Sequence, residues 1–307
     1  MALLRRETPD ARRQTNPWVQ GARPRTLPAA VVPVLVGSAA AYYDRVFDWR
    51  AFSLALVGAL AIQVAANFAN DVSDAARGAD PGDRSGPPRM VASGVVSAPK
   101  MWFATWIAIA VATACGIGLT FLAGPVVIAI GVASILAMLG YVGGPMPYGY
   151  RGFGEVFVFL FFGLVATGAS RLVHDGSVPG WVWLLGIPIG MLAAAILVAN
   201  NLRDIATDAR VGKKTLAVRL GTARTQRLYG VLTWGAVAIT AALAVAGVTP
   251  PTTLAATLAA PLIPRLTALA NGGEGASLVP LLSGTARLHL SFGVLLSAGI
   301  AVAGFTR

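Results

Sequence analysis

The chain has 307 residues and a net charge of +11 at pH 7, with 56% hydrophobic and only 12% charged residues. A soluble domain carries about a quarter charged residues, and the mean hydropathy here is +0.69. The composition therefore excludes an ordinary soluble domain and predicts an integral membrane protein. A single cysteine, Cys115, and two histidines, His174 and His289, exclude an intrachain disulfide and argue against a zinc site of cysteines and histidines.

Residues 1–25 are basic and polar, and they lack the short apolar core and small-residue cleavage site of a signal peptide. We expect them to form a cytoplasmic tail. The rest of the chain, residues 26–307, is predicted to be a single transmembrane domain.

Nine apolar segments follow, and each is long enough to cross the hydrocarbon core of a bilayer as a helix. Their ranges are Thr26 to Tyr43, Ala51 to Phe68, Met101 to Ala123, Pro125 to Val142, Phe153 to Leu172, Trp181 to Ala199, Leu228 to Val248, Thr252 to Ala270, and Leu288 to Phe305. They lack the alternation of polar and apolar residues that a transmembrane barrel requires. The predicted fold is an all-α, polytopic membrane protein with nine transmembrane helices.

Basic residues in the loops between these segments indicate how the chain crosses the membrane. If the N-terminus is cytoplasmic, twenty of the twenty-four lysines and arginines fall inside, and only Arg45, Arg50, Arg171 and Arg307 fall outside. Cytoplasmic loops carry such an excess. The sequence therefore predicts a protein of the cell membrane with a cytoplasmic N-terminus and an external C-terminus. Because the charge follows the loops rather than one face of a domain, nucleic acid is not an expected partner.

Two polar, acidic stretches interrupt the apolar pattern, one after the second segment and one after the sixth. Their side chains recur every three or four residues: Gln63, Asn67, Asn70 or Asp71, and Asp74 in the first stretch, and Asn200, Asp204 and Asp208 in the second. In a helix such side chains share one face. Lipid would penalise them, so we expect both faces to line the interior. Because four crossings separate the stretches, both should open to the cytoplasm as walls of one cavity.

Basic residues stand among these acids and suggest the kind of ligand. They are Arg77, Arg84 and Arg89 near the first stretch and Arg203, Lys213 and Lys214 in the second. Carboxylates together with bases fit a polyphosphate bridged by Mg²⁺, which prefers oxygen ligands, with arginine and lysine neutralising the remaining charge. A diphosphate on an apolar tail would place its head at the inner rim and its tail between helices. Metal makes that head a better leaving group, and an allylic tail would leave a carbocation for an electron-rich carbon to capture.

The loop from Tyr141 to Glu155, YVGGPMPYGYRGFGE, is rich in glycine and proline and is expected to turn at the inner surface. It carries two further tyrosines, Tyr148 and Tyr150, beside Arg151. Tyrosines at this depth are commonly membrane anchors. Over the cavity they could instead shield a carbocation with their π faces or position an aromatic acceptor.

Several motifs resemble those of the UbiA superfamily of intramembrane prenyltransferases. They are NDVSD with RGAD at 70–80, and NLRDIATD with GKKTLAVRLG at 201–221. The stretch YVGGPMPYGYRGFGEVFVFLFFGLVATGAS is most similar to the branch that prenylates 1,4-dihydroxy-2-naphthoate on the route to menaquinone. The resemblance covers residues 17–307. It implies a nine-helix bundle that opens to the cytoplasm under a cap of inner loops, with Mg²⁺ as cofactor and a polyprenyl diphosphate and an aromatic acceptor as substrates.

The resemblance and the polar stretches together give the candidate site residues. The predicted metal-site residues are Asn70, Asp74, Asp80, Asn200, Asp204 and Asp208, and the acids with a predicted catalytic role are Asp71, Asp74, Asp204 and Asp208. The predicted diphosphate contacts are Arg77, Arg84, Arg89, Lys213 and Lys214. The residues expected near the acceptor or the carbocation are Asn67, Tyr141, Tyr148, Arg151 and Glu155. Gly78 stands where many relatives carry an acid, and Asp80 is expected to substitute for it.

The expected reaction attaches the prenyl group at the ring carbon that bears the carboxylate, with loss of CO₂ and diphosphate, and gives demethylmenaquinone. Within the same chemistry the acceptor could be 4-hydroxybenzoate, a chlorophyllide or a sugar phosphate. From a different class, the bundle could be a transporter of a cation or a lipid phosphate. A transporter is expected to carry polar residues through the full depth of the membrane, whereas the outer half of each segment here is almost wholly apolar.

Overall fold

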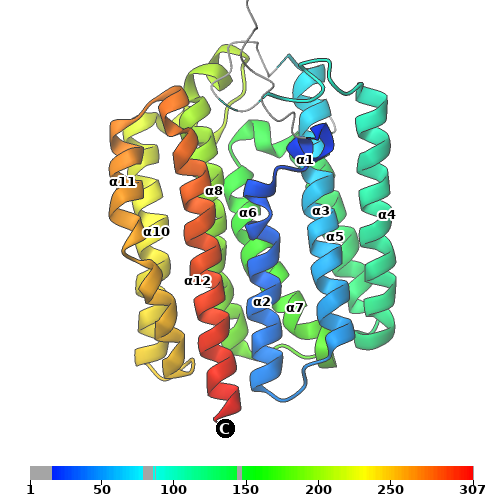
Figure 1. Ribbon diagram of the computed structural model, residues 1–307, viewed down its shortest axis with the longest axis vertical. Coiled ribbons are helices and arrows are strands. Elements are labelled where there is room, and N and C mark those ends of the chain that lie inside the picture. The colour runs from blue at the N-terminus through cyan, green and yellow to red at the C-terminus, as the bar shows by residue number, and fades with distance from the viewer. Residues whose placement is uncertain (1–15, 79–85, 87, 144–146, 307) are drawn as a thin grey trace, which may run out of the picture.

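The computed structural model describes residues 16–78, 86, 88–143 and 147–306, and every regular element within them is helical. The helices stand side by side as a bundle (Figure 1). The seven long helices are α2 (Pro28–Tyr43), α3 (Trp49–Ala76), α4 (Ala98–Ala123), α5 (Val126–Val142), α8 (Gly180–Arg210), α10 (Thr222–Val245) and α12 (Val279–Phe305). The all-α prediction is confirmed.

Two of the predicted segments depart from a regular α-helix. One is a continuous span whose middle is π-helical and consists of α6 (Gly154–Val158), η3 (Phe159–Val165) and α7 (Ala166–Asp175). The other is a pair of helices bent by 40°, the 3₁₀ element η4 (Pro251–Ala259) and α11 (Leu262–Gly272). Shorter elements connect or precede these: α1 (Pro17–Ala22), η1 (Pro24–Thr26), η2 (Tyr148–Arg151), α9 (Leu216–Leu220) and η5 (Gly275–Leu278).

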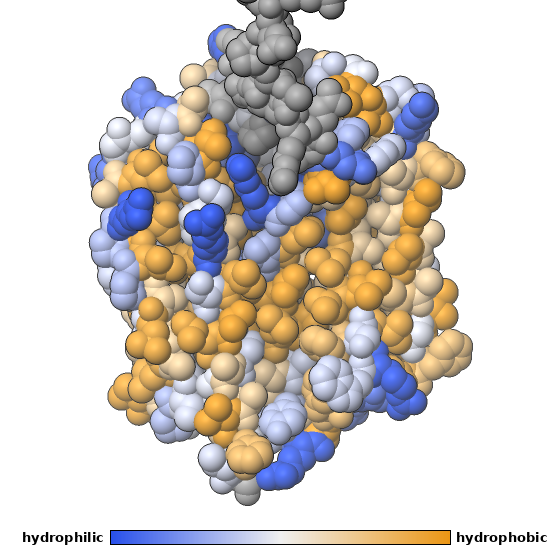
Figure 2. Space-filling model, in the orientation of Figure 1, coloured by the Kyte–Doolittle hydropathy of each residue, from blue (hydrophilic) through white to orange (hydrophobic). Residues whose placement is uncertain are grey.

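Among the described residues, six helical spans are long and apolar enough to cross a membrane, or eight if each of two bent pairs counts as one span. These pairs are Pro17–Thr26 with Pro28–Tyr43 and Pro251–Ala259 with Leu262–Gly272. The helix Val126–Val142 is apolar but shorter. Figure 2 shows a broad hydrophobic belt around the middle of the visible face, with hydrophilic residues gathered toward its two ends. The protein is therefore a multi-pass membrane protein.

The helices α3 and α8 extend well beyond the apolar segments that predict them. We predicted Ala51 to Phe68 and Trp181 to Ala199, whereas α3 continues to Ala76 and α8 to Arg210. No glycine or proline interrupts either acidic stretch, so the backbone remains helical until Gly78 and Gly212, which have positive φ angles of 64° and 73°. Both acidic stretches therefore lie on rigid helix ends.

The helix α8 forms the centre of the bundle. Its Leu185, Ile189 and Leu192 are fully buried in a cluster that includes Phe292 of α12. On another side the backbone of α8 lies very close to η3 at Gly190. A side chain at this position would place its Cβ atom only 2.6 Å from the carbonyl oxygen of Phe159. Small residues allow such close helix packing in membranes, and here they set η3 firmly against α8.

A cluster of charges around one buried arginine lies at the end of the bundle at which the chain terminates (Figure 1). Arg171 of α7 is 2% exposed. Its Nη2 lies 2.9 Å from Asp44 Oδ2, after α2, and its Nη1 lies 2.6 Å from Asp175 Oδ1. His174 accepts a hydrogen bond from the backbone nitrogen of Asp48, before α3, at 3.0 Å. These contacts tie α2, α3 and α7 together.

We expect Arg171→Leu to lower the free energy of unfolding by about 2 kcal/mol, because it removes a buried cation that joins α2 to α7 and leaves the partly exposed Asp44 and Asp175 uncompensated. The measurement is denaturant unfolding in detergent micelles. The exposed pair of Arg50 and Asp48 provides the control: Arg50→Leu should leave the unfolding midpoint almost unchanged, since exposed ion pairs contribute little. Equal midpoints for the two variants would contradict the structural role of Arg171.

Candidate active site

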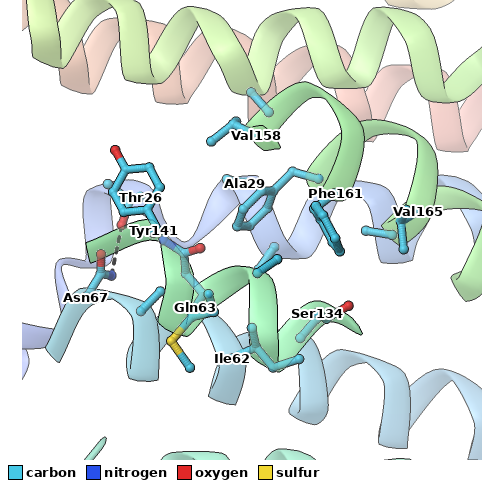
Figure 3. A pocket seen from close by; sticks show the side chains of 18 of the residues that line it. Thr26, Ala29, Ile62, Gln63, Asn67, Ser134, Tyr141, Val158, Phe161 and Val165 are labelled. Atoms are coloured by element: carbon cyan, nitrogen blue, oxygen red, sulfur yellow. Dashed lines mark hydrogen bonds between the residues drawn. The ribbon is translucent and has the colours of Figure 1, made fainter. Parts of the chain in front are cut away.

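A cavity of about 350 Å³ runs along the inside of α3, and its lining includes Leu54 near one end and Asp74 at the other. At about 1.5 Å per residue, this separation is roughly 30 Å. The walls are mostly apolar, as the side chains from α3, α5 and the α6–η3 segment in Figure 3 illustrate. Leu119, Val127 and Val173 line the deep end, where they belong to one hydrophobic cluster. The cavity is therefore suited to a long apolar group.

Polar side chains gather at the opposite end, which we call the mouth of the cavity. The lining there includes Asn67, Asn70, Asp74 and Arg89, together with Asn200, Asn201 and Lys213 from the second acidic stretch and the turn after it. Nζ of Lys213 lies 3.9 Å from Asp74 Oδ1 and 3.8 Å from Asp208 Oδ1. One ammonium group therefore lies between a carboxylate of α3 and a carboxylate of α8, so the two acidic stretches meet at the mouth.

Asp74 is the most connected acid of the mouth. Nη2 of Arg89 lies 2.9 Å from its Oδ2, and the phenol of Tyr150 donates a hydrogen bond to its Oδ1 at 2.6 Å. The ring of Tyr150 also lies beneath two cations, with Arg77 Cζ at 5.0 Å and Lys213 Nζ at 4.9 Å from its centre. Burial and the Asp74 carboxylate raise the pKa of Tyr150 well above its usual value, so the phenol remains a donor at neutral pH.

Asp71 has different neighbours from Asp74. Its carboxylate accepts hydrogen bonds from the backbone nitrogens of Met90 (3.1 Å) and Val91 (2.8 Å), and it does not line the cavity. These bonds fix the segment that carries Arg89. The contacts of Asp71 are thus those of a positioning residue.

Asp204 is held by its neighbour Arg203 through two contacts, Nε to Oδ1 at 2.7 Å and Nη2 to Oδ2 at 2.6 Å. The same Nη2 donates to Oδ1 of Asn200 at 2.9 Å. Neither Asp204 nor Asp208 lines the cavity directly, although Asp208 reaches Lys213. The second stretch therefore presents Asn200 to the cavity and its two aspartates to the surrounding cations.

The residues predicted near the acceptor fall into two groups. Asn67, Tyr141 and Tyr148 line the cavity, whereas Arg151 and Glu155 do not. Buried Glu155 accepts a hydrogen bond from Asn201 at 2.8 Å.

Among the predicted diphosphate contacts, Arg89 and Lys213 line the cavity and Lys214 does not. Arg77 donates to the carbonyl oxygen of Val142. Asp80 and Arg84 lie outside the described residues.

Residues 30–271 match the model of the UbiA prenyltransferase family. The chain belongs to this family. The predicted resemblance is confirmed, and with it the prediction that the protein is an aromatic prenyltransferase.

Individual UbiA relatives agree with this assignment. The chain is 41% identical over 286 residues to the 1,4-dihydroxy-2-naphthoate octaprenyltransferase of Mycobacterium tuberculosis, covering 92% of this chain and 96% of the relative. It is 33% identical over 297 residues to the protein of the same name in Haemophilus influenzae, covering 93% and 96%. The fold is similar to that of a UbiA homolog from Archaeoglobus fulgidus, solved bound to DMAPP and Mg²⁺, with a TM-score of 0.61, 15% identity, and 92% and 99% coverage.

The donor set at the mouth of this UbiA protein fits a hard cation. Among the described residues no three aspartates, glutamates, histidines or cysteines form a ready metal cluster. However, Asp74 and Asp208 already share the positive charge of Lys213, and the amide groups of Asn70 and Asn200 line the same mouth. Carboxylate and amide oxygens are the ligands that Mg²⁺ accepts, and it usually takes further oxygens from a bound phosphate.

Three residues at or beside the mouth are missing from the site predicted by sequence. Arg23 and Asn201 line the cavity, and Tyr150 contacts Asp74 without lining the cavity. Arg23 and Tyr150 have no periodic signal, since each lies at a turn: Tyr150 lies in η2, and Arg23 separates α1 from η1 with a positive φ of 51°.

Proposed function

We propose that this UbiA protein transfers a polyprenyl group from polyprenyl diphosphate to 1,4-dihydroxy-2-naphthoate, with loss of CO₂ and diphosphate, giving demethylmenaquinone in its quinol form. The observation that carries the chemistry is the meeting of Asp74 and Asp208 at Lys213, at the mouth of a long apolar cavity. The choice of acceptor rests on the relatives in Mycobacterium tuberculosis and Haemophilus influenzae.

In this proposal the mouth holds the diphosphate and the cavity holds the prenyl tail. Bound Mg²⁺ would neutralise the diphosphate and make it a better leaving group. The residues that would hold it are Asn70, Asp74, Asn200, Asp204 and Asp208, with Asp80 added from the family motif. Arg89 and Lys213 lie against Asp74. From these positions they can donate hydrogen bonds to phosphate oxygens as negative charge develops on the leaving group.

The acceptor would lie beside the diphosphate end of the prenyl group, near Asn67, Tyr141 and Tyr148. Tyr148 stacks on Phe157, with their ring centres 3.9 Å apart, and both residues line the cavity. The faces of aromatic rings stabilise a nearby cation, here the carbocation of the prenyl group. The ring carbon that bears the carboxylate forms the new bond to the prenyl group. Loss of that carboxylate as CO₂ returns its electron pair to the ring and restores aromaticity, so no oxidant is required.

We further propose nine crossings, with the short helix α5 and the two bent segments each counted as one. The N-terminal end of the described chain and the C-terminus lie at opposite ends of the bundle (Figure 1), which supports an odd number. The mouth and its basic loops would face the cytoplasm under a cap of inner loops, and the external C-terminus would lie across the cell membrane. Residues 1–25 would lie on the cytoplasmic side, with α1 and Arg23 packed at the mouth, and residues 26–307 would form the single membrane domain.

The deciding experiment supplies purified protein with octaprenyl diphosphate, 1,4-dihydroxy-2-naphthoate labelled at its carboxyl carbon, and Mg²⁺. We expect labelled CO₂, diphosphate and the prenylated quinol in equal amounts. Turnover with 4-hydroxybenzoate but not with the naphthoate would change the acceptor within the family. Silence with both acceptors, together with flux of a cation or lipid phosphate into vesicles, would favour the transporter.

Tyr150→Phe is expected to lower turnover about tenfold, because it removes a hydrogen bond to the charged Asp74. The wild-type phenol has a raised pKa, so it remains protonated through pH 9. The ratio of wild-type to variant rates should therefore be constant from pH 7 to pH 9. Tyr42→Phe, at an exposed position on α2, is the control and should keep the wild-type rate. A ratio that falls to one at pH 9 would contradict this role.

A further inference from the structure

A hydrogen-bond network beside the mouth fixes the direction of one polar group that the proposed reaction does not use. Thr26 donates its single hydroxyl proton to the carbonyl oxygen of Arg23 at 3.0 Å. Its hydroxyl oxygen can therefore only accept from its other neighbours, Nε2 of Gln63 (3.2 Å) and Nδ2 of Asn67 (3.1 Å). Figure 3 shows Thr26, Gln63 and Asn67 close together, with the bond between Thr26 and Asn67 drawn.

Because the amide nitrogen of Gln63 is committed to Thr26, its amide oxygen must point elsewhere. Gln63 is 7% exposed and lines the cavity. Its Oε1 has no hydrogen-bond partner within the described part of the chain. Leaving a buried acceptor unpaired is costly. Oε1 itself exposes less than 1 Å², so a donor on a ligand in the cavity can satisfy this acceptor after a small rotation of the Gln63 side chain brings it to the wall.

The substrates of the proposed reaction differ in what they could offer to this oxygen. The polyprenyl tail has no polar atom, and an ionised diphosphate has only acceptors. The dihydroxynaphthoate has two hydroxyl donors. Its 1-hydroxyl stands next to the carboxylate and can donate to it within the molecule, whereas its 4-hydroxyl needs an acceptor from outside. Gln63 lies two helical turns from Asn70, or about 10 Å along α3, which leaves space for an aromatic ring between the amide and the diphosphate end.

We infer that Oε1 of Gln63 accepts a hydrogen bond from the 4-hydroxyl of the aromatic acceptor and thereby turns the carboxylate-bearing carbon toward the prenyl diphosphate. The inference rests on the proposed function and names a specificity-determining contact for its acceptor. A ring without this hydroxyl leaves the buried amide oxygen unpaired, and sites built to bind a hydroxyl reject analogues that lack it. The network of Thr26 and Asn67 holds the amide in place for this selection.

The test is equilibrium binding of four probes to the full-length protein: 1,4-dihydroxy-2-naphthoate kept reduced, 4-hydroxy-2-naphthoate, 1-hydroxy-2-naphthoate and 2-naphthoate. Gln63→Leu and the linear Gln63→Met both remove the amide oxygen. We expect each variant to weaken the two probes with a 4-hydroxyl about tenfold, and to bind the other two within twofold of wild type. Gln226→Leu removes an amide outside the cavity, whose Nε2 donates to the carbonyl oxygen of Ala270, and should bind all four probes as wild type does.

Unchanged binding of 2-naphthoate also shows that the variants are folded. An equal loss for all four probes, no loss for any, or a loss that follows the 1-hydroxyl would overturn the inference. Turnover adds a second measurement: Gln63→Leu should raise the KM for the naphthoate and leave the KM for the polyprenyl diphosphate unchanged. If the proposed function itself is wrong, the wild-type protein will give no product from the naphthoate, whatever the binding data show.

Discussion

Replacing Asp74 by asparagine is expected to reduce prenyl transfer by about a thousandfold, because one charged contact of a leaving group and its metal supplies several kcal/mol to the transition state. Asp74 is the group on which Arg89, Tyr150 and Lys213 converge. The neutral amide has almost the same shape but can no longer hold a divalent cation against a diphosphate. We expect Asp208→Asn to have an effect of the same order, since Asp208 shares Lys213 from the opposite helix.

The measurement is the initial rate at saturating substrates, with thermal unfolding of each variant as a check on folding. Asp48→Asn is the matched control at the far end of α3, where hydrogen bonds from Arg50 lower the pKa of Asp48 to about 2 and the carboxylate is ionised at every assay pH. This variant should keep at least half of the wild-type rate. A rate for Asp74→Asn close to that of Asp48→Asn would contradict the site.

Removal of Mg²⁺ with EDTA is expected to abolish turnover, with a loss of more than about a thousandfold, and renewed Mg²⁺ should restore it. Without the metal, the carboxylates of Asp74 and Asp208 would repel an incoming diphosphate, because the charges of Arg89 and Lys213 are already engaged in neutralising these carboxylates. Ca²⁺, which is larger and takes more ligands, should restore binding better than it restores turnover.

Direct binding provides the second measurement for the metal. Labelled polyprenyl diphosphate should dissociate from the wild-type protein when EDTA is added and rebind with Mg²⁺. In Asp74→Asn the Mg²⁺ concentration for half-maximal binding should rise at least tenfold, because a carboxylate oxygen is lost from the site. Turnover and binding that are indifferent to both EDTA and Mg²⁺ would favour a metal-independent carrier.

The sequence could predict what depends on composition and period. Long apolar runs identify the helices, and the four-residue spacing of Asn200, Asp204 and Asp208 correctly places them on one helix, α8. The same reasoning underestimates the length of α3 and α8, since an apolar run ends where polarity begins, whereas a helix ends where its backbone must turn, here at Gly78 and Gly212.

Contacts across the mouth could not be predicted in the same way. Asp71 lies three residues before Asp74, only about 60° around the helix, so spacing alone groups the two acids; the structure instead places Asn70 at the cavity and turns Asp71 toward the backbone of Met90 and Val91. Tyr150 reaches Asp74 only because the chain after α5 folds back over α3. Such contacts depend on tertiary structure, which leaves no periodic trace in the residues.

The deep end of the cavity has a consequence for the permeability of the membrane. A hollow about as long as the hydrocarbon core is thick would, if open at both ends, let protons and ions leak across. Leu119, Val127 and Val173 close its base with apolar side chains, and the charge of Arg171, two residues before Val173, is neutralised by Asp44 and Asp175. The protein can thus keep a charged mouth at one end of the cavity without opening a path for ions through the bundle.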